Sequence, residues 1–182
     1  MESSDHASWI VTRVNGKISS IAADYRHFAD IARRIAAAPS EATASVSAEK
    51  ISTMELLSMK VCWDDFMLFG SSFQKKVWKS LFDIATCPCL YSYSDFAAKC
   101  GTPSGTRAVA HAVAANPVAY LIPCHLIVPK ETIDRVMSIQ MDAQSTLFKG
   151  EDLYLLDTID VGQYAYGPEV KRRFIKISLG RV

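Results

Sequence analysis

The sequence has no apolar run as long as a membrane span, and its first residues, Met1-Glu2-Ser3-Ser4-Asp5, lack the character of a secretory signal. Its five cysteines show no paired spacing of the kind that holds structural zinc, because Cys87-Pro88-Cys89 is too tight for such a site. An odd number of free thiols favours a reducing, intracellular compartment. These absences predict a chain that binds neither a membrane nor a metal.

The chain also lacks a large net charge, because its 20 Lys and Arg side chains are nearly balanced by 19 Asp and Glu side chains. The distribution along the chain is uneven, however. Residues 71–130 carry six basic against two acidic side chains, and residues 161–182 carry five against one. Residues 131–160 carry two against seven. Local positive charge is typical of phosphate binding, and a solvated basic face is the alternative.

With 182 residues and 49% hydrophobic content, the chain can bury one good core or two small ones. Residues 9–14 and 17–21 flank Asn15-Gly16, which predicts a β-hairpin with a type I′ turn. Apolar side chains at helical spacing predict a helix between Tyr25 and Ala38, namely Phe28, Ile31, Ala32 and Ile35. The Ala/Ser-rich segment 39–47 is predicted to be a loop or linker. Residues 1–70 are thus predicted to be a small α/β scaffolding domain.

Residues 71–182 are predicted to form a second, mainly helical domain, which makes the expected fold class α/β in the α+β sense. Ser71 or Ser72 can cap a helix whose apolar stripe is formed by Phe73, Val77, Leu81 and Ile84. Residues 94–100, the turn Gly101-Thr102-Pro103 and residues 104–115 are typical of a helix–turn–helix, with Ser104 as N-cap.

The second helix of this pattern, residues 104–115, consists mostly of Ala and Val. Readout of the major groove uses Arg, Asn, Gln or Lys at several positions, whereas this helix has only Arg107 and His111. Small side chains suit close approach to the minor groove, about 6 Å wide, where sequence information is poor. The pattern predicts sequence-tolerant minor-groove binding, and a simply buried helix is the alternative.

Leu121-Ile122-Pro123-Cys124-His125 places a soft nucleophile between a conformationally restricted proline and a histidine. Such a cysteine can attack an electrophilic carbon when its thiolate is populated and its site excludes water. A buried thiol beside a core histidine is the alternative, and this short stretch alone favours it.

Six motifs in order decide between these alternatives: Phe73-Gln74-Lys75-Lys76-Val77-Trp78, Tyr91-Ser92-Tyr93, Gly101-Thr102-Pro103 leading to Arg107-Ala108-Val109, Asn116-Pro117, Leu121 to His125, and Gly162-Gln163-Tyr164. Their order and spacing resemble the methylated-DNA–protein-cysteine methyltransferases (6-O-methylguanine-DNA methyltransferases), whose acceptor cysteine lies in a Pro-Cys-His-Arg motif. The resemblance runs from about Ser72 to Val128 and resumes from Gly162 to Lys171. It implies a winged-helix-like, DNA-binding catalytic domain.

The resemblance implies catalytic roles for four residues. Cys124 would accept an alkyl group from the 6-oxygen of guanine and keep it, so each molecule would act once. His125 would serve as general base through a bridging water. Tyr93 would help to rotate the phosphate backbone and donate a proton to the base, and Asn116 would hold the loop that carries the cysteine.

The resemblance also implies a partner, double-stranded DNA carrying alkylated guanine, bound by a monomer without cofactor, metal or membrane. Arg107 would fill the space of the flipped nucleotide. The implied DNA contacts are Arg107, Tyr93, Ser104, Ala108 and Lys75, and the implied substrate pocket is Ile127, Tyr164 and Ala165. Such a protein would lie in the nucleus of a eukaryote, or in the cytoplasm or nucleoid of a bacterium.

Three departures from the family pattern leave the activity open. Leu126 replaces the arginine of the Pro-Cys-His-Arg motif, and Ser178 stands where the family has a glutamate that orients the histidine. The acidic segment 131–160 replaces a short turn. We interpret it as a disordered surface insertion, and a second hypothesis is that it competes with DNA for the basic face.

Two other functions therefore remain as alternatives. A weakened or inactive alkyltransferase-like protein would bind alkylated DNA and signal to other repair, which Leu126 and Ser178 favour. A cysteine hydrolase that uses Cys124 and His125 is the third, although no oxyanion-hole motif is visible.

Overall fold

A computed structural model describes residues 8–37, 44–142 and 156–180. The N-terminal part is an antiparallel sheet of β1 (Ser8–Val14), β2 (Lys17–Ala22) and β3 (Val46–Ser52) in the order β2-β1-β3. Asn15 and Gly16 have φ of 51° and 79°, as a type I′ turn requires, so the hairpin prediction is confirmed. β3 begins inside the segment predicted as a linker, of which residues 39–43 lie outside the described residues.

One helix, α1 (Arg26–Ala36), covers one face of this sheet, as the apolar spacing predicts. Its Ile31 and Ile35 are buried against Val14, with Met67 and Phe69 packed beside them. After β3, the short helix α2 (Thr53–Ser58) is closed by a capping box between Ser52 and Glu55.

The outer edge of β2 joins this sheet to the rest of the chain. The amide of Met67 donates to Ile18 O at 2.8 Å. The amide of Ile21 donates to Pro117 O at 2.9 Å, and Ile21 O accepts from Ala119 N at 3.0 Å. The sheet is therefore hydrogen-bonded directly to the segment that leads to Cys124.

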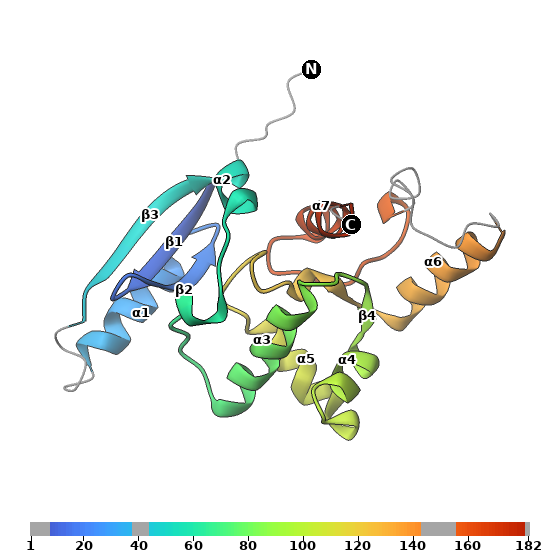
Figure 1. Ribbon diagram of the computed structural model, residues 1–182, viewed down its shortest axis with the longest axis horizontal. Helices are drawn as coiled ribbons and strands as arrows, with labels where there is room; N and C mark the ends of the chain where they lie inside the picture. Colours follow the sequence, from blue (N-terminus) through green and yellow to red (C-terminus); the bar gives the residue numbers. More distant parts are fainter. Residues whose placement is uncertain (1–7, 38–43, 143–155, 181–182) are drawn as a thin grey trace, which may run out of the picture.

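The C-terminal part is mainly helical, with α3 (Ser72–Ile84), α4 (Tyr93–Lys99), α5 (Thr106–Ala114), α6 (Lys130–Asp142) and α7 (Pro168–Leu179). Two short strands, β4 (Tyr91–Ser92) and β5 (Ile127–Val128), pair in parallel. Figure 1 shows the sheet and α1 at one end of the molecule, α3 to α5 in the middle and α6 at the other end. None of the described helices is long and apolar enough to cross a membrane.

The helix–turn–helix is confirmed in α4 and α5, but the cap assigned to Ser104 is wrong. Ser104 lies inside a 3-10 turn, Pro103–Gly105, and Gly105 occupies the N-cap position of α5 without a side-chain hydrogen bond. Pro103, with its fixed φ and missing N–H, suits the first position of that turn. The capping prediction for α3 is confirmed, because Ser71 and Gln74 form a capping box.

The acidic segment is folded at both described ends, so its interpretation as a disordered insertion is wrong there. Val136 on α6 and Leu156 pack with Val128 and with Ile175 on α7 in a small separate core, so Leu156 anchors this end of the segment. The hydroxyl of Thr132 donates to Asp160 O at 2.5 Å.

Basic side chains of α7 hold the end of this segment. Arg172 Nε donates to Leu156 O at 3.0 Å and its guanidinium also reaches Ile159 O at 3.2 Å. Lys176 Nζ lies 2.6 Å from a carboxylate oxygen of Asp157. The positive charge of residues 161–182 is therefore used largely inside the protein, which weakens its interpretation as a phosphate-binding stretch.

We expect Leu156→Ala to lower the free energy of unfolding by about 2–5 kcal/mol, because it empties a fully buried position in the small core. Met137→Ala is the control, since Met137 on α6 is 56% exposed and its loss should change stability by less than about 0.5 kcal/mol. Urea denaturation of both variants measures the difference. Equal stabilities would mean that the segment does not pack in solution.

Candidate active site

Cys124 begins a 3-10 turn, Cys124–Leu126, that leads from the loop after α5 into β5. Its half-buried side chain lines a cavity of about 340 Å³, within the size range of small-molecule sites. The cavity wall comes from α4, α5, the loop after α5, and the segment before and within α7: Tyr93, Val113, Ala114, Asn116, Ala119, Gln163, Tyr164, Ala165, Tyr166 and Lys171. The structure thus brings Cys124, Tyr93, Asn116, Tyr164 and Ala165 together, as the sequence predicts.

The Asn116 side chain organises the loop that presents the thiol. Its Nδ2 lies within donating distance of three acceptors, 2.8 Å from Ile122 O, 3.1 Å from Val118 O and 3.1 Å from Cys124 Sγ. Its Oδ1 accepts from Val118 N at 3.1 Å. One amide therefore closes the loop and also donates to the sulfur.

Opposing effects set the acidity of Cys124. Burial raises the pKa of its thiol, because a thiolate loses solvation in a packed site. The amide of Asn116, the hydroxyl of Tyr164 and the positive charge of Lys171 act in the opposite direction and lower the pKa. The thiolate is thus populated only as far as these three groups stabilise it.

His125 is completely buried behind the thiol and does not line the cavity. Its ring stacks on Tyr120, with centroids 5.7 Å apart and planes 5° apart, and its Nε2 lies 2.8 Å from Ser178 Oγ. Its Nδ1 is buried and has no hydrogen-bond partner among the described residues. Burial and the nearby Lys171 charge lower the His125 pKa to about 3, so the ring is neutral at physiological pH.

Ser178 and Leu126, the two positions that depart from the family pattern, line the same second cavity of about 610 Å³. Tyr120, Lys60 and Phe82 also line it. The smaller hydroxyl of Ser178 reaches His125, so the ring keeps a partner on that side but lacks a carboxylate.

Three tyrosines surround the thiol. Burial raises the pKa of Tyr93, and the nearby Cys124 adds to this effect. Burial and Cys124 also raise the pKa of Tyr166, to about 12. The hydroxyl of Tyr164 is buried beside Cys124 and has no partner of normal hydrogen-bond geometry among the described residues. All three phenols therefore keep their protons at neutral pH and can act as donors.

Lys171 is the residue that the sequence analysis missed. It is 1% exposed, and its Nζ lies 3.4 Å from Gln163 O. Burial lowers its pKa to about 8, against the raising effects of Cys124 and Asp160. Helical spacing in the sequence could have indicated this residue, because Lys171 shares one face of α7 with the buried Phe174 and Ile175.

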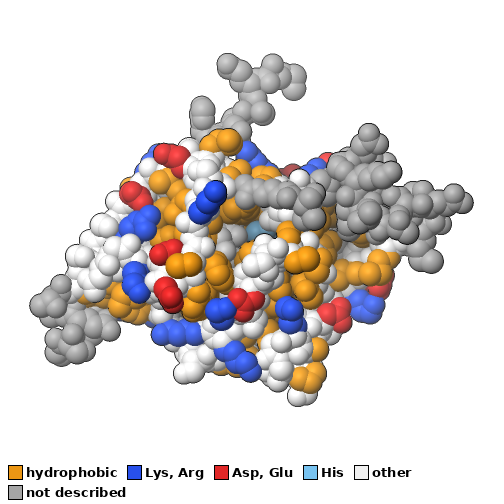
Figure 2. Space-filling model, in the orientation of Figure 1, with side chains coloured by type: hydrophobic (Ala, Val, Ile, Leu, Met, Phe, Trp, Pro, Cys, Tyr) orange, Lys and Arg blue, Asp and Glu red, His pale blue; other side chains and the backbone are white. Residues whose placement is uncertain are grey.

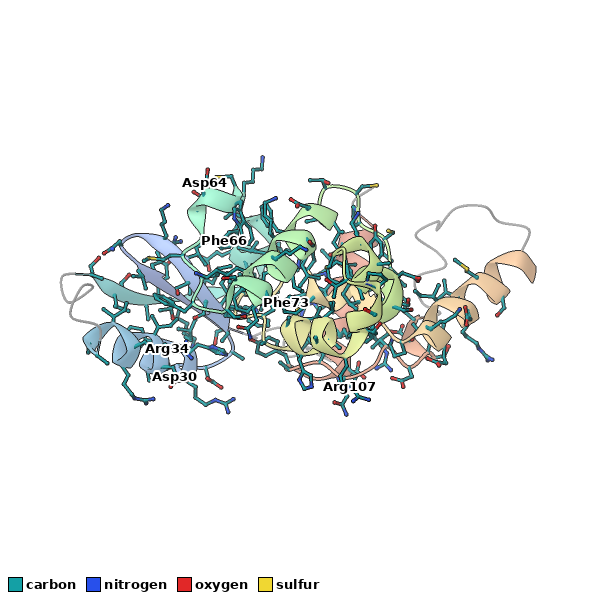
Figure 3. The ribbon with its side chains drawn as sticks, turned by 90° about the horizontal axis from the view of Figure 1, so that it is seen from below. Asp30, Arg34, Asp64, Phe66, Phe73 and Arg107 are labelled. Atoms are coloured by element: carbon teal, nitrogen blue, oxygen red, sulfur yellow. The ribbon has the colours of Figure 1, made fainter. Side chains whose placement is uncertain are left out.

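The other predicted residues lie elsewhere. Arg107, Ala108, Ser104 and Lys75 are all exposed, and Figure 3 shows Arg107 at the outer edge of α5. Ile127 pairs with Tyr91 in the parallel strands and is buried in the main core, so it does not line the cavity. In the described part of the chain, His, Cys, Asp and Glu nowhere gather in threes that could hold a metal.

Comparison with known proteins identifies the helical part. The family model described as 6-O-methylguanine DNA methyltransferase, DNA binding domain, matches residues 72–152. The chain is 46% identical over 66 residues to a probable methylated-DNA–protein-cysteine methyltransferase of Acanthamoeba polyphaga mimivirus, covering 36% of this chain and 44% of that protein. It is 41% identical over 61 residues to the Saccharomyces cerevisiae methyltransferase of the same name, covering 34% and 32%.

A crystal structure of an OGT variant from Mycobacterium tuberculosis matches almost the whole fold, with 95% of this chain and 94% of that one covered, a TM-score of 0.51 and 17% identity. That likeness shows the mixed α/β fold, including the N-terminal sheet. The sequence alignments span less than half the length of the two relatives. Residues 72–152 thus match the DNA-binding domain of the 6-O-methylguanine DNA methyltransferase family, and over this part the chain is similar to the two methyltransferases.

Proposed function

We propose that this protein repairs duplex DNA by moving a methyl or other alkyl group from the 6-oxygen of guanine to Cys124, once per molecule. The observation that carries the proposal is the half-buried Cys124 thiol, held by Asn116 in a cavity of about 340 Å³ within a domain of this family. The proposed partner is DNA bound by a monomer, without a cofactor. The protein would act in the nucleus of a eukaryote or the cytoplasm of a bacterium.

In the proposed reaction the thiolate sulfur attacks the alkyl carbon, a carbon–sulfur bond forms and the carbon–oxygen bond breaks. The electron pair of that bond passes to guanine, which takes a proton from Tyr93. The thiol proton passes through a bridging water to His125 Nδ1, the buried nitrogen that has no protein partner among the described residues. The thioether has no route to removal, so the protein is consumed.

Four DNA-facing residues in this proposal are exposed and lie outside the lining of the Cys124 cavity. Arg107, near the start of α5, fills the space of the flipped nucleotide, and Ala108 beside it allows close approach to the groove. Ser104 lies in the turn before α5 and Lys75 in the second turn of α3. Tyr164 and Ala165 form the cavity wall that faces the flipped base.

A second function, lesion binding without efficient transfer, is favoured by the state of His125. A base whose conjugate acid has a pKa of about 3 accepts a proton poorly, and Ser178 supplies no charge to strengthen it. We propose that transfer is slower than a carboxylate at position 178 would allow.

Cys124→Ser should abolish repair and leave duplex binding nearly intact, because a hydroxyl of similar size is a far weaker nucleophile. The assay is cleavage of a 6-O-methylguanine duplex by an endonuclease that the methyl group blocks. Wild-type protein should repair one guanine per molecule and then stop. Repair of many guanines per molecule would contradict the proposal and indicate a hydrolase, and binding without repair would indicate the second function.

Lys171→Met should make the folded protein more stable at neutral pH and its Cys124 thiol less reactive. The fall in the Lys171 pKa from 10.5 to about 8 corresponds to roughly 3 kcal/mol of lost stability at neutral pH. Below about pH 8 both states hold the proton and the penalty is complete. From pH 8 to 10.5 the folded state loses its proton first, so wild-type stability should rise towards that of the variant.

The same variant should react more slowly through Cys124, because removing a positive charge raises the thiol pKa. Urea denaturation against pH gives the stability, and the pH dependence of iodoacetamide labelling at Cys124 gives the reactivity. A variant that is less stable at neutral pH, or labelled as readily as the wild type, would refute this role of Lys171.

Ser178→Glu should speed alkyl transfer by about tenfold or more, because a carboxylate beside His125 Nε2 raises the histidine pKa and strengthens the base. The second cavity beside Ser178 gives the larger side chain room. Single-turnover transfer rates should be compared with those of Ser178→Gln, which has the same size without charge. An equal rise in both variants would assign the effect to packing.

A further inference from the structure

A third cavity, of about 550 Å³ and with several polar lining residues, lies between the N-terminal sheet region and the helical part. We call it the α1–α3 cleft, and its polar lining comprises Ser19, His27, Asp30, Arg34, Ser71, Gln74 and Lys75. It is separate from the Cys124 cavity, because the two have no lining residue in common. Of its lining residues, the proposed function uses only Lys75, as a DNA contact.

The cleft holds two basic side chains that no described residue neutralises. The side chains of Arg34 and Lys75 have no ion-pair or hydrogen-bond partner among the described residues, whereas those of Arg13, Arg172 and Lys176 do. Asp30, the acidic residue of the lining, is bound to Arg33 at 2.9 Å and is thereby partly neutralised. The free charge in the cleft is therefore cationic.

A buried hydroxyl adds a second, independent observation. Ser19 lines the cleft, is 1% exposed, and its Oγ has no hydrogen-bond partner among the described residues. Buried polar atoms are rarely left without a partner, so an unused donor in a cationic cleft favours an anionic, oxygen-bearing ligand.

The position of the cleft relative to α5 indicates where such a ligand comes from. Ala115, the C-cap of α5, lines the cleft, while Arg107 lies eight residues earlier on the same helix. At 1.5 Å per residue, the cleft is about 12 Å along the helix from Arg107. That distance corresponds to roughly three to four base pairs of a duplex.

Arg34 and Arg107 also lie on the same side of the molecule. Figure 3 shows Asp30 and Arg34 on α1 and Arg107 on α5 along one edge of the molecule, and Asp64 at the opposite edge. Figure 2 shows the opposite face, where basic and acidic side chains are interspersed without a continuous area of either sign. Arg34 and Arg107 lie on the other side of the molecule, along one edge, where one duplex can contact both.

We propose that the α1–α3 cleft binds a backbone phosphate of the same duplex whose damaged guanine enters the Cys124 cavity. Arg34 and Lys75 donate to the phosphate oxygens, and Ser19 lies within the pocket as a further donor. The N-terminal part then contributes to the DNA-binding surface in addition to supporting the loop before Cys124. This inference rests on the proposed function for the presence of DNA.

The test compares Arg34→Gln with wild-type protein by the salt dependence of binding to an unmodified duplex that extends well beyond the Arg107 site on both sides. Loss of one phosphate contact should lower the slope of log K against log [salt] by about 0.9 in magnitude. The matched control is Lys17→Gln, which removes one charge from the same N-terminal part. Lys17 lies near Asp65 and outside the cleft, so the slope should stay unchanged.

A duplex series locates the contact. Two shortened duplexes are compared, each cut to within two base pairs of the Arg107 site at one end. The duplex that lacks the contacted phosphate should bind wild type and Arg34→Gln equally, and the other should still bind wild type more tightly. Equal slopes for wild type and Arg34→Gln on the long duplex would overturn the inference. Inorganic phosphate that binds in the cleft while the DNA slopes stay equal would also overturn it, in favour of a free-anion site.

These outcomes are separable from failure of the proposed function. If wild-type protein binds no duplex, both fail together. If it binds duplex and repairs guanine while Arg34→Gln matches it at every salt concentration, the inference about the cleft fails alone.

Discussion

The architecture of the site depends on the hydrogen bonds of one amide, that of Asn116. The loop from α5 to Cys124 has little regular structure, and Tyr120 within it adopts a left-handed conformation with φ of 64°. Asn116 satisfies two carbonyls and one amide of this loop and donates to the sulfur at its end. The edge of β2 fixes the same loop from outside through Ile21. The N-terminal sheet thus acts on the chemistry through the backbone that carries the nucleophile.

Burial of the side chains around the thiol limits the reactivity of Cys124. Excluding water from Cys124, His125 and Lys171 destabilises every charged form in the cluster, which raises the cysteine pKa and lowers the other two. A carboxylate would stabilise the charged form of the histidine, but Ser178 and Leu126, which line one cavity together, are both uncharged. His125 is therefore a weak base for the thiol proton. Lys171 provides the positive charge that stabilises the thiolate.

Local patterns in the sequence predicted much of the fold and the centre of the site. The Asn15-Gly16 turn, the apolar spacing of α1 and the capping serine of α3 depend on neighbouring residues, and such signals are readable along a chain. β3 was missed because an edge strand with one exposed face carries a weak apolar pattern. The acidic segment was misread because its core forms only when Leu156 meets Ile175 across the fold, and Lys171 was missed because its burial depends on tertiary packing.

In the proposed reaction Cys124 alone accepts the alkyl group, although Cys62, Cys87 and Cys89 are more exposed. The most direct test is peptide mapping of the protein after reaction with duplex DNA whose 6-O-methylguanine carries an isotope-labelled methyl group. The account predicts one label per protein molecule, confined to the peptide that contains Cys124. Label on the peptides of the exposed cysteines, or its release as free methanol, would contradict it.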